Sequence, residues 1–176
     1  ARQGAPAGTV VVADYQTQGR GRRGAAWTAP AGTSVLCSLI ARPATPLPPH
    51  HLAILTGVGA ANGLHALAPA VKIKWPNDLM LADRKIAGIL VETTGNAVVI
   101  GIGINCAIPD TAFPEELRQR AGSLHALLET EISREAVLAA VVHGMADALA
   151  RVEAGGIIKV LREWNTINWH TRRRVR

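Results

Sequence analysis

Three short apolar runs separated by two-residue turns constrain the fold more than any other feature of the sequence. The runs cover residues 79–82, 85–93 and 97–105. The pairs between them, Asp83-Arg84 and Gly95-Asn96, suit antiparallel hairpins, because a parallel connection needs a crossover of about a dozen residues. The middle of the chain is therefore predicted to form an antiparallel sheet.

The remaining elements predict a mixed α/β (α+β) fold. Further strands are expected at residues 9–15, 34–41 and 71–75, and helices at 51–67, 124–128, 134–152 and 157–164. Ser133 is a suitable N-cap for the long third helix, and small residues within 51–67 predict a helix packed closely on its neighbour. Strands interrupted by one helix and followed by several helices predict a largely antiparallel sheet and exclude a regular βαβ alternation.

Composition limits the class of protein. The 176 residues fit one domain, and 48% hydrophobic with 18% charged residues exclude global disorder. No stretch approaches the roughly 20 apolar residues of a membrane span, so no membrane association is expected. Cys37 and Cys106 lie far apart in apolar runs, which predicts buried thiols in a reducing, cytoplasmic compartment.

Positive charge is concentrated in two places. The net charge is +6, but four of the 19 cations lie in the last five residues. The other concentration lies between Asp14 and Asp78, where lysines and arginines occur without a single carboxylate. This one-sided stretch predicts a site for an anionic small molecule. Nucleic-acid binding would rest on the tail alone, and without aromatic residues among the arginines DNA binding is not expected.

The segment GRGRRG at residues 19–24 matches the dinucleotide-binding pattern GxGxxG in letters only. That pattern opens a helix and is followed about 20 residues later by an acidic residue. Here residues 29–32 (APAG) cannot form a helix body, and the next acidic residue is Asp78. Either an anion-binding loop or a solvated basic loop fits the segment. Its glycines predict a mobile loop that closes on its ligand.

Residues 98–105 divide into two very different faces. The apolar face carries Val98, Ile100, Ile102 and Ile104. The opposite face carries Val99, Gly101, Gly103 and Asn105. A face nearly stripped of side chains predicts that either a flat ligand or a packed helix lies against it.

The run 71–75 places Lys72 and Lys74 on one strand face, followed by a turn at Asn77-Asp78. These groups would hold a substrate anion, or they would form an ordinary hairpin with lysines in water. Lys85 opens the next strand and is either a surface lysine or an electrophilic one. Trp27 would stack on a ring or anchor the loop.

Classical catalytic signatures are missing from the sequence. It contains no HExxH, paired CxxC or GxSxG motif, so a metal site built by protein ligands alone is not expected.

Four ordered motifs resemble biotin protein ligases. They are QTQGRGRRG (16–24) with Trp27, KWPND (74–78), RKIAGILVE (84–92) and GIGIN (101–105). The likeness covers nearly the whole chain and implies a fold similar to the catalytic core of class II aminoacyl-tRNA synthetases. It implies ATP, Mg²⁺ and biotin as reactants. Biotin and MgATP would give biotinyl-5′-AMP, and a lysine of a biotin carboxyl-carrier protein domain would then accept the biotin.

The resemblance also implies roles for individual residues. Catalytic roles would fall to Arg22, Lys85 and Asp78. Biotin and the adenylate would be bound by Gln16, Gly19, Arg20, Gly21, Arg22, Trp27, Lys85 and Gly88. The nucleotide would be bound by Lys74, Asn77, Asp78 and Asn105. Asn105 would contact the adenine edge, and Gly88 would let biotin approach the strand.

The ends of the chain depart from the family pattern. Residues 1–170 would form the catalytic domain without its usual N-terminal Ser/Thr-Thr-Asn segment, and 171–176 would begin a C-terminal β-barrel or form a basic tail. A non-catalytic biotin- or adenylate-binding remnant and a lipoate ligase are the alternatives. The sequence leaves both a monomer and a homodimer open.

Overall fold

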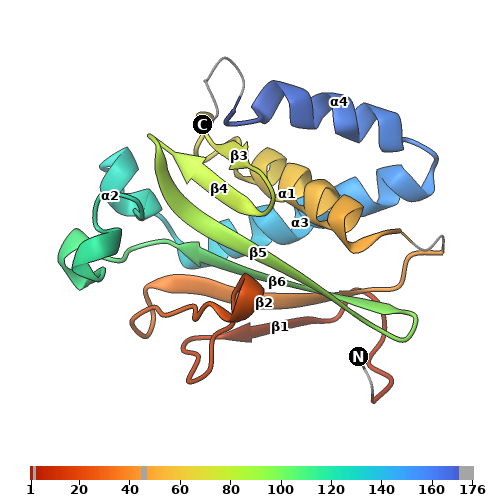
Figure 1. Cartoon of the computed structure of the whole chain (residues 1–176), viewed down its shortest axis with the longest axis horizontal. Coiled ribbons are helices and arrows are strands. Elements are labelled where there is room, and N and C mark those ends of the chain that lie inside the picture. Colours follow the sequence, from red (N-terminus) through yellow and green to blue (C-terminus); the bar gives the residue numbers. More distant parts are fainter. Residues whose placement is uncertain (2, 45–46, 171–176) are drawn as a thin grey trace.

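Six strands form one sheet in the order β1-β2-β6-β5-β4-β3, and every neighbouring pair is antiparallel (Figure 1). The strands are β1 (Val10–Ala13), β2 (Ser34–Ala41), β3 (Lys72–Lys74), β4 (Asp78–Leu81), β5 (Arg84–Thr94) and β6 (Ala97–Asn105). The predicted antiparallel sheet is confirmed. The computed structural model describes residues 1, 3–44 and 47–170, so the predicted tail or barrel start at 171–176 lies outside the described residues.

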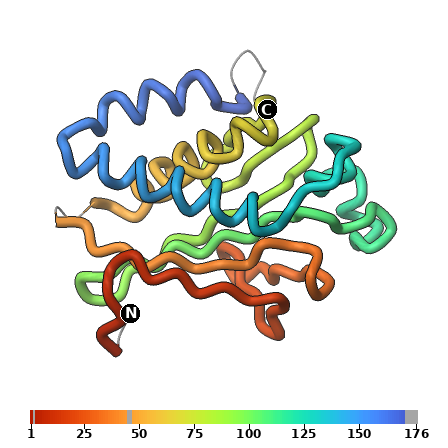
Figure 2. Tube along the Cα trace, turned by 180° about the vertical axis from the view of Figure 1, so that it is seen from behind, coloured from red at the N-terminus to blue at the C-terminus, as the bar shows by residue number. Residues whose placement is uncertain are grey.

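Helices α1, α3 and α4 gather on one face of the sheet, as the view from behind shows, while the short α2 lies at the end of the strands (Figure 2). The helices are α1 (Pro49–Leu64), α2 (Leu124–Leu128), α3 (Arg134–Glu153) and α4 (Ile157–Ile167), with short 3₁₀ turns at Arg22–Gly24, Asp110–Ala112 and Glu115–Leu117. Ser133 caps α3 as predicted, because its hydroxyl accepts a hydrogen bond from the Ala136 amide at 3.2 Å. Within the described residues, no helix has the length and apolar character needed to cross a membrane.

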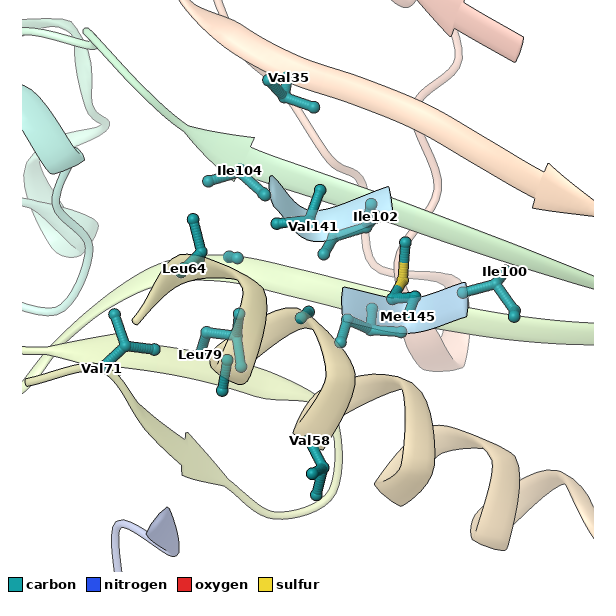
Figure 3. Packing of buried hydrophobic residues seen from close by; sticks show 14 of the residues in the cluster. Val35, Val58, Leu64, Val71, Leu79, Ile100, Ile102, Ile104, Val141 and Met145 are labelled. Atoms are coloured by element: carbon teal, nitrogen blue, oxygen red, sulfur yellow. The ribbon is translucent and has the colours of Figure 1, made fainter. Parts of the chain in front are cut away.

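The core fills the space between the sheet and these helices (Figure 3). Ile100 and Ile104 of β6 are fully buried, as are Val141 and Met145 of α3. Each such side chain contributes about 1.5–3 kcal/mol by leaving water. The two predicted faces of residues 98–105 are therefore confirmed: the isoleucines face the helices and the glycines face away from them.

Glycines let α1 and α3 approach closely. A Cβ atom on Gly59 would lie 2.7 Å from the Met145 Cα, and one on Gly63 would lie 2.8 Å from the Ala140 carbonyl carbon. Any side chain at these positions would push the helices apart. This confirms the close packing predicted for the first long helix.

Two predicted turns are displaced. The β4–β5 turn is formed by Ala82 (φ 46°) and Asp83 (φ 63°), not by Asp83-Arg84, because Arg84 already pairs with Leu81 in the sheet. Two successive positive φ values suit the twist of a two-residue hairpin. Asp78 likewise belongs to β4, not to the preceding turn, since it pairs with Lys74 and with Gly88.

Candidate active site

A cavity of about 450 Å³ lies on the sheet face opposite the helices. Its walls come from strands β2, β4, β5 and β6 and from residues 16–27, here called the Arg loop. Most of the predicted site residues line it, namely Gln16, Arg20, Gly21, Arg22, Trp27, Asn77, Asp78, Lys85 and Gly88. Segments far apart in the sequence thus converge on one space.

The flat object on the glycine face is the indole ring of Trp27. A Cβ on Gly103 would lie 2.7 Å from the Trp27 Cζ2, and a Cβ on Gly88 would lie 3.0 Å from its Cζ3. Among the described residues, no helix packs on these two glycines. Gly101, whose Cβ would lie 3.6 Å from its nearest neighbour, leaves part of the cavity floor open.

A bulge turns Lys85 toward this cavity. The register between β4 and β5 shifts between Leu79, opposite Ala87, and Met80, opposite Lys85, so Ile86 has no partner of its own. Without that extra residue, Lys85 and Gly88 would face opposite sides of the sheet. With it, the Lys85 Nζ lies 2.7 Å from the Asp78 Oδ1 and 5.7 Å from the centre of the Trp27 ring.

The Arg loop is folded on itself over the cavity. The Trp27 amide donates to the Gly19 carbonyl at 3.0 Å, and the Gly21 amide donates to the Ala25 carbonyl at 2.7 Å. Gly19 is not in the cavity wall, but a Cβ there would come within 2.9 Å of the Gln16 Oε1, so a side chain at this position would disturb the loop; its predicted contact with biotin stays a prediction.

Two side-chain contacts tie the loop to the sheet. The Arg20 Nη2 lies 3.0 Å from the Glu92 Oε2, and the Arg22 Nη1 donates to the Asn77 Oδ1 at 3.4 Å. Asn77 is itself held because its Nδ2 donates to the Ile89 carbonyl at 2.8 Å. The guanidinium groups of Arg20 and Arg22 therefore stand at the cavity wall with donors to spare for an anion.

Lys74 and Asn105 are placed elsewhere. The Lys74 Nζ lies 4.8 Å from the centre of the Trp169 ring and outside the cavity wall. Asn105 is buried, and its Nδ2 donates to the Gly122 carbonyl at 3.0 Å. The structure does not bring these two residues together with the others, and their predicted contacts with a nucleotide remain predictions.

The cavity wall also holds three residues that were not predicted as site residues, namely Ser38, Glu92 and Gln18. Ser38 lies directly opposite Gly101 because β2 pairs with β6. No local signal could reveal this pairing, since the two paired residues lie 63 positions apart in the sequence. Glu92 could have been predicted from the sequence, because it lies four residues after Gly88 and so on the same face of the strand.

The cysteines are unsuited to nucleophilic catalysis. Burial raises the pKa of the Cys37 thiol to about 11 and that of the Cys106 thiol to about 11. Both are therefore protonated at neutral pH, as expected for core thiols. No histidine lines the cavity among the residues that the structure describes. The described part of the cavity wall carries Arg20, Arg22 and Lys85 and is therefore rich in positive charge.

Across residues 1, 3–44 and 47–170, no group of three or more His, Cys, Asp or Glu side chains is arranged to hold a metal ion. The Asp78 carboxylate, which lies beside Lys85, fits a metal that arrives with a polyphosphate, because such ions take few protein ligands.

Several known proteins are similar to this chain in sequence and in fold. The model of the biotin/lipoate A/B protein ligase family matches residues 2–108. The bifunctional ligase/repressor BirA of Bacillus spizizenii is 40% identical over 145 residues, which cover 78% of this chain and 45% of that protein. BirA of Escherichia coli is 36% identical over 173 residues, covering 92% and 52%. The chain thus spans about half the length of the curated relatives it matches.

A solved structure gives the same result. Biotin protein ligase from Aquifex aeolicus, in complex with biotin and ATP, superposes with a TM-score of 0.86 at 26% identity, covering 94% of this chain and 71% of that one. The predicted fold and the resemblance to biotin protein ligases are confirmed. The chain belongs to the biotin/lipoate A/B protein ligase family.

Proposed function

We propose that this chain activates biotin with MgATP to biotinyl-5′-AMP and then transfers the biotinyl group to a lysine of a biotin carboxyl-carrier domain. One observation carries the proposal: the motifs that resemble biotin protein ligases converge on a single cavity whose wall holds Arg20, Arg22 and Lys85. Residues 1–170 would act as the catalytic domain, in the cytoplasm.

In the first half-reaction, a biotin carboxylate oxygen attacks the α-phosphorus of ATP, and pyrophosphate leaves. Negative charge grows on the phosphoryl oxygens during this step, and a fixed ammonium stabilises it. The Lys85 Nζ is suited to this role, because Asp78 occupies only part of its donor capacity. Arg22 would hold the phosphate of the mixed anhydride.

In the second half-reaction, the acceptor lysine amine attacks the acyl carbon, AMP leaves, and the new amide nitrogen loses a proton. Asp78 stands beside Lys85, where it could orient the incoming amine or a substrate metal. Neither half-reaction needs an enzyme nucleophile, which agrees with the protonated state of the two thiols.

The first test is incubation with biotin, ATP and Mg²⁺, followed by mass spectrometry for biotinyl-5′-AMP. We expect adenylate from the parent chain, a fall of about 100- to 1,000-fold in Lys85→Ala, and no change in the exposed control Lys72→Ala. Addition of a carrier domain should then give a biotinylated lysine.

Two other outcomes would contradict the proposal. Biotin binding by calorimetry without adenylate would identify a binding protein in place of a ligase. Adenylate formed from lipoate and not from biotin would identify a lipoate ligase, although the similar structure from Aquifex aeolicus is that of a biotin protein ligase.

A further inference from the structure

Arg84 stands next to Lys85 in the sequence but reaches away from the cavity. Its Nε donates to the Ala121 carbonyl at 2.6 Å, and its Nη2 donates to the Arg118 carbonyl at 2.8 Å. Its two Nη atoms also contact the two carboxylate oxygens of Asp110 at 3.0 and 2.8 Å. The Arg84 side chain is only 19% exposed. We call this set of contacts the Arg84 clamp.

The segment held by the clamp also holds the backbone of Lys85. The Lys85 amide donates to the Arg120 carbonyl at 2.7 Å, and the Gly122 amide donates to the Lys85 carbonyl at 2.9 Å. Strand β6 does not reach this far, since its last partner on β5 is Ala87. Residues 120–122 therefore replace β6 as the neighbour of Lys85, outside the regular sheet.

Gly122 fits the clamp closely. A Cβ there would lie 3.1 Å from the Arg84 Nε and 2.8 Å from the Leu127 Cδ1. The Gly122 carbonyl accepts the hydrogen bond from Asn105. One short segment thus contacts Lys85 on one side and Asn105 on the other.

We propose that Arg84 is a positioning residue: the Arg84 clamp holds residues 120–122 against β5 and so fixes the backbone from which Lys85 reaches the reacting groups. The inference rests on the proposed function for its kinetic consequence, but the clamp itself can be tested without it. A guanidinium can satisfy a carboxylate and two carbonyls at once, whereas an ammonium lacks that planar fork. A displacement of about 1 Å at a catalytic group can cost roughly 100-fold in rate.

The direct test is hydrogen exchange of the Lys85 and Gly122 amides in Arg84→Lys. We expect both amides to exchange roughly tenfold faster than in the parent chain. The matched control is Arg118→Lys, which removes hydrogen bonds to the Phe113 and Thr111 carbonyls and leaves the clamp contacts in place. Unchanged exchange of the two amides in Arg84→Lys, or an equal effect in the control, would overturn the inference.

The kinetic test is a double-mutant cycle on adenylate formation. Arg84→Lys should lower kcat roughly 10- to 100-fold with KM for biotin nearly unchanged, while Arg118→Lys stays near the parent. In a Lys85→Ala background the same Arg84→Lys change should have almost no further effect, because Arg84 acts through Lys85. Independent, multiplicative losses would contradict a positioning role.

The design separates the two hypotheses. A parent chain that forms no adenylate would refute the proposed function, and the exchange measurement would still decide the clamp. If Arg84→Lys does not fold, Asp110→Asn replaces it, since the Asp110 side chain is 51% exposed. That variant should raise exchange at Lys85 and Gly122 severalfold, and no change would overturn the inference.

Discussion

The Arg loop and the strands beneath it form one cavity, yet they are held by very different forces. The floor belongs to β2, β5 and β6, whose backbones pair along their length and whose opposite face packs against the helices. The Arg loop has a few backbone hydrogen bonds and two exposed side-chain contacts to the sheet, from Arg20 and Arg22. Exposed ion pairs typically contribute only about 0–1 kcal/mol.

The rigid floor and the weakly held Arg loop suit different tasks in the site. A rigid floor suits a group such as Lys85, whose position must not vary during the reaction. A weakly held loop suits arginines that must admit a ligand and then close over it. Trp27 joins the two regions, because it ends the loop and its ring lies on Gly88 and Gly103 of the floor.

Two neighbouring arginines of the Arg loop differ in whether they line the cavity. Arg22→Ala should lower kcat/KM for adenylate formation roughly 100-fold, because its guanidinium stands in the cavity wall beside Asn77. Arg23→Ala is the matched control, since Arg23 is also exposed but does not line this cavity. Neither change should alter the free energy of unfolding. Equal loss of activity in both variants would mean that loop charge, and not a specific contact, matters.

A pair of glycine variants tests the contact between loop and floor. Gly103→Ala should lower the free energy of unfolding by about 2 kcal/mol, since its Cβ would collide with the Trp27 ring. Gly101→Ala, two residues away on the same strand, meets only ordinary contacts and should leave stability unchanged or slightly raised. Urea denaturation without ligand measures both. Equal stability of the two variants would show that Trp27 does not rest on Gly103.

The packing of the floor can be tested by alkaline pH. Burial raises the pKa of Cys37 and of Cys106 to about 11, from 9.0 in an exposed thiol. The unfolded chain therefore releases these protons first, so their stabilisation is complete below pH 9 and is lost as the pH rises through 11. At pH 10 the loss should be about 1 kcal/mol per thiol. Denaturation of a Cys37→Ala/Cys106→Ala variant should show a correspondingly flatter decline, and an identical decline would mean that the thiols are accessible.

The last prediction concerns the motion of the Arg loop, where only a small change is expected. Hydrogen exchange across residues 18–26 should slow severalfold when biotin and ATP are added, because the ligand supplies contacts that the loop lacks. Amides in the centre of β6 should exchange slowly in both states. A loop whose exchange does not respond to the ligands would contradict the assigned division between mobile loop and rigid floor.

Much of the fold follows from local patterns. Residues 34–41, 97–105 and 124–128 form the predicted elements with the predicted bounds. Helix α4 continues three residues beyond its predicted end, because Trp164 and Ile167 pack against the core. The end of α4 therefore depends on contacts with distant elements, which the spacing of apolar residues within the helix does not reveal.

The strands, their buried faces and the motifs that resemble biotin protein ligases can be predicted from the sequence, because they depend on residues close together in the chain. The three-dimensional packing places Trp27 over the glycines, Ser38 opposite Gly101, and residues 120–122 beside Lys85 where β6 does not reach. Those contacts join segments separated by dozens of residues. Their selection depends on the packing and hydrogen bonding of the whole sheet, which no local spacing records.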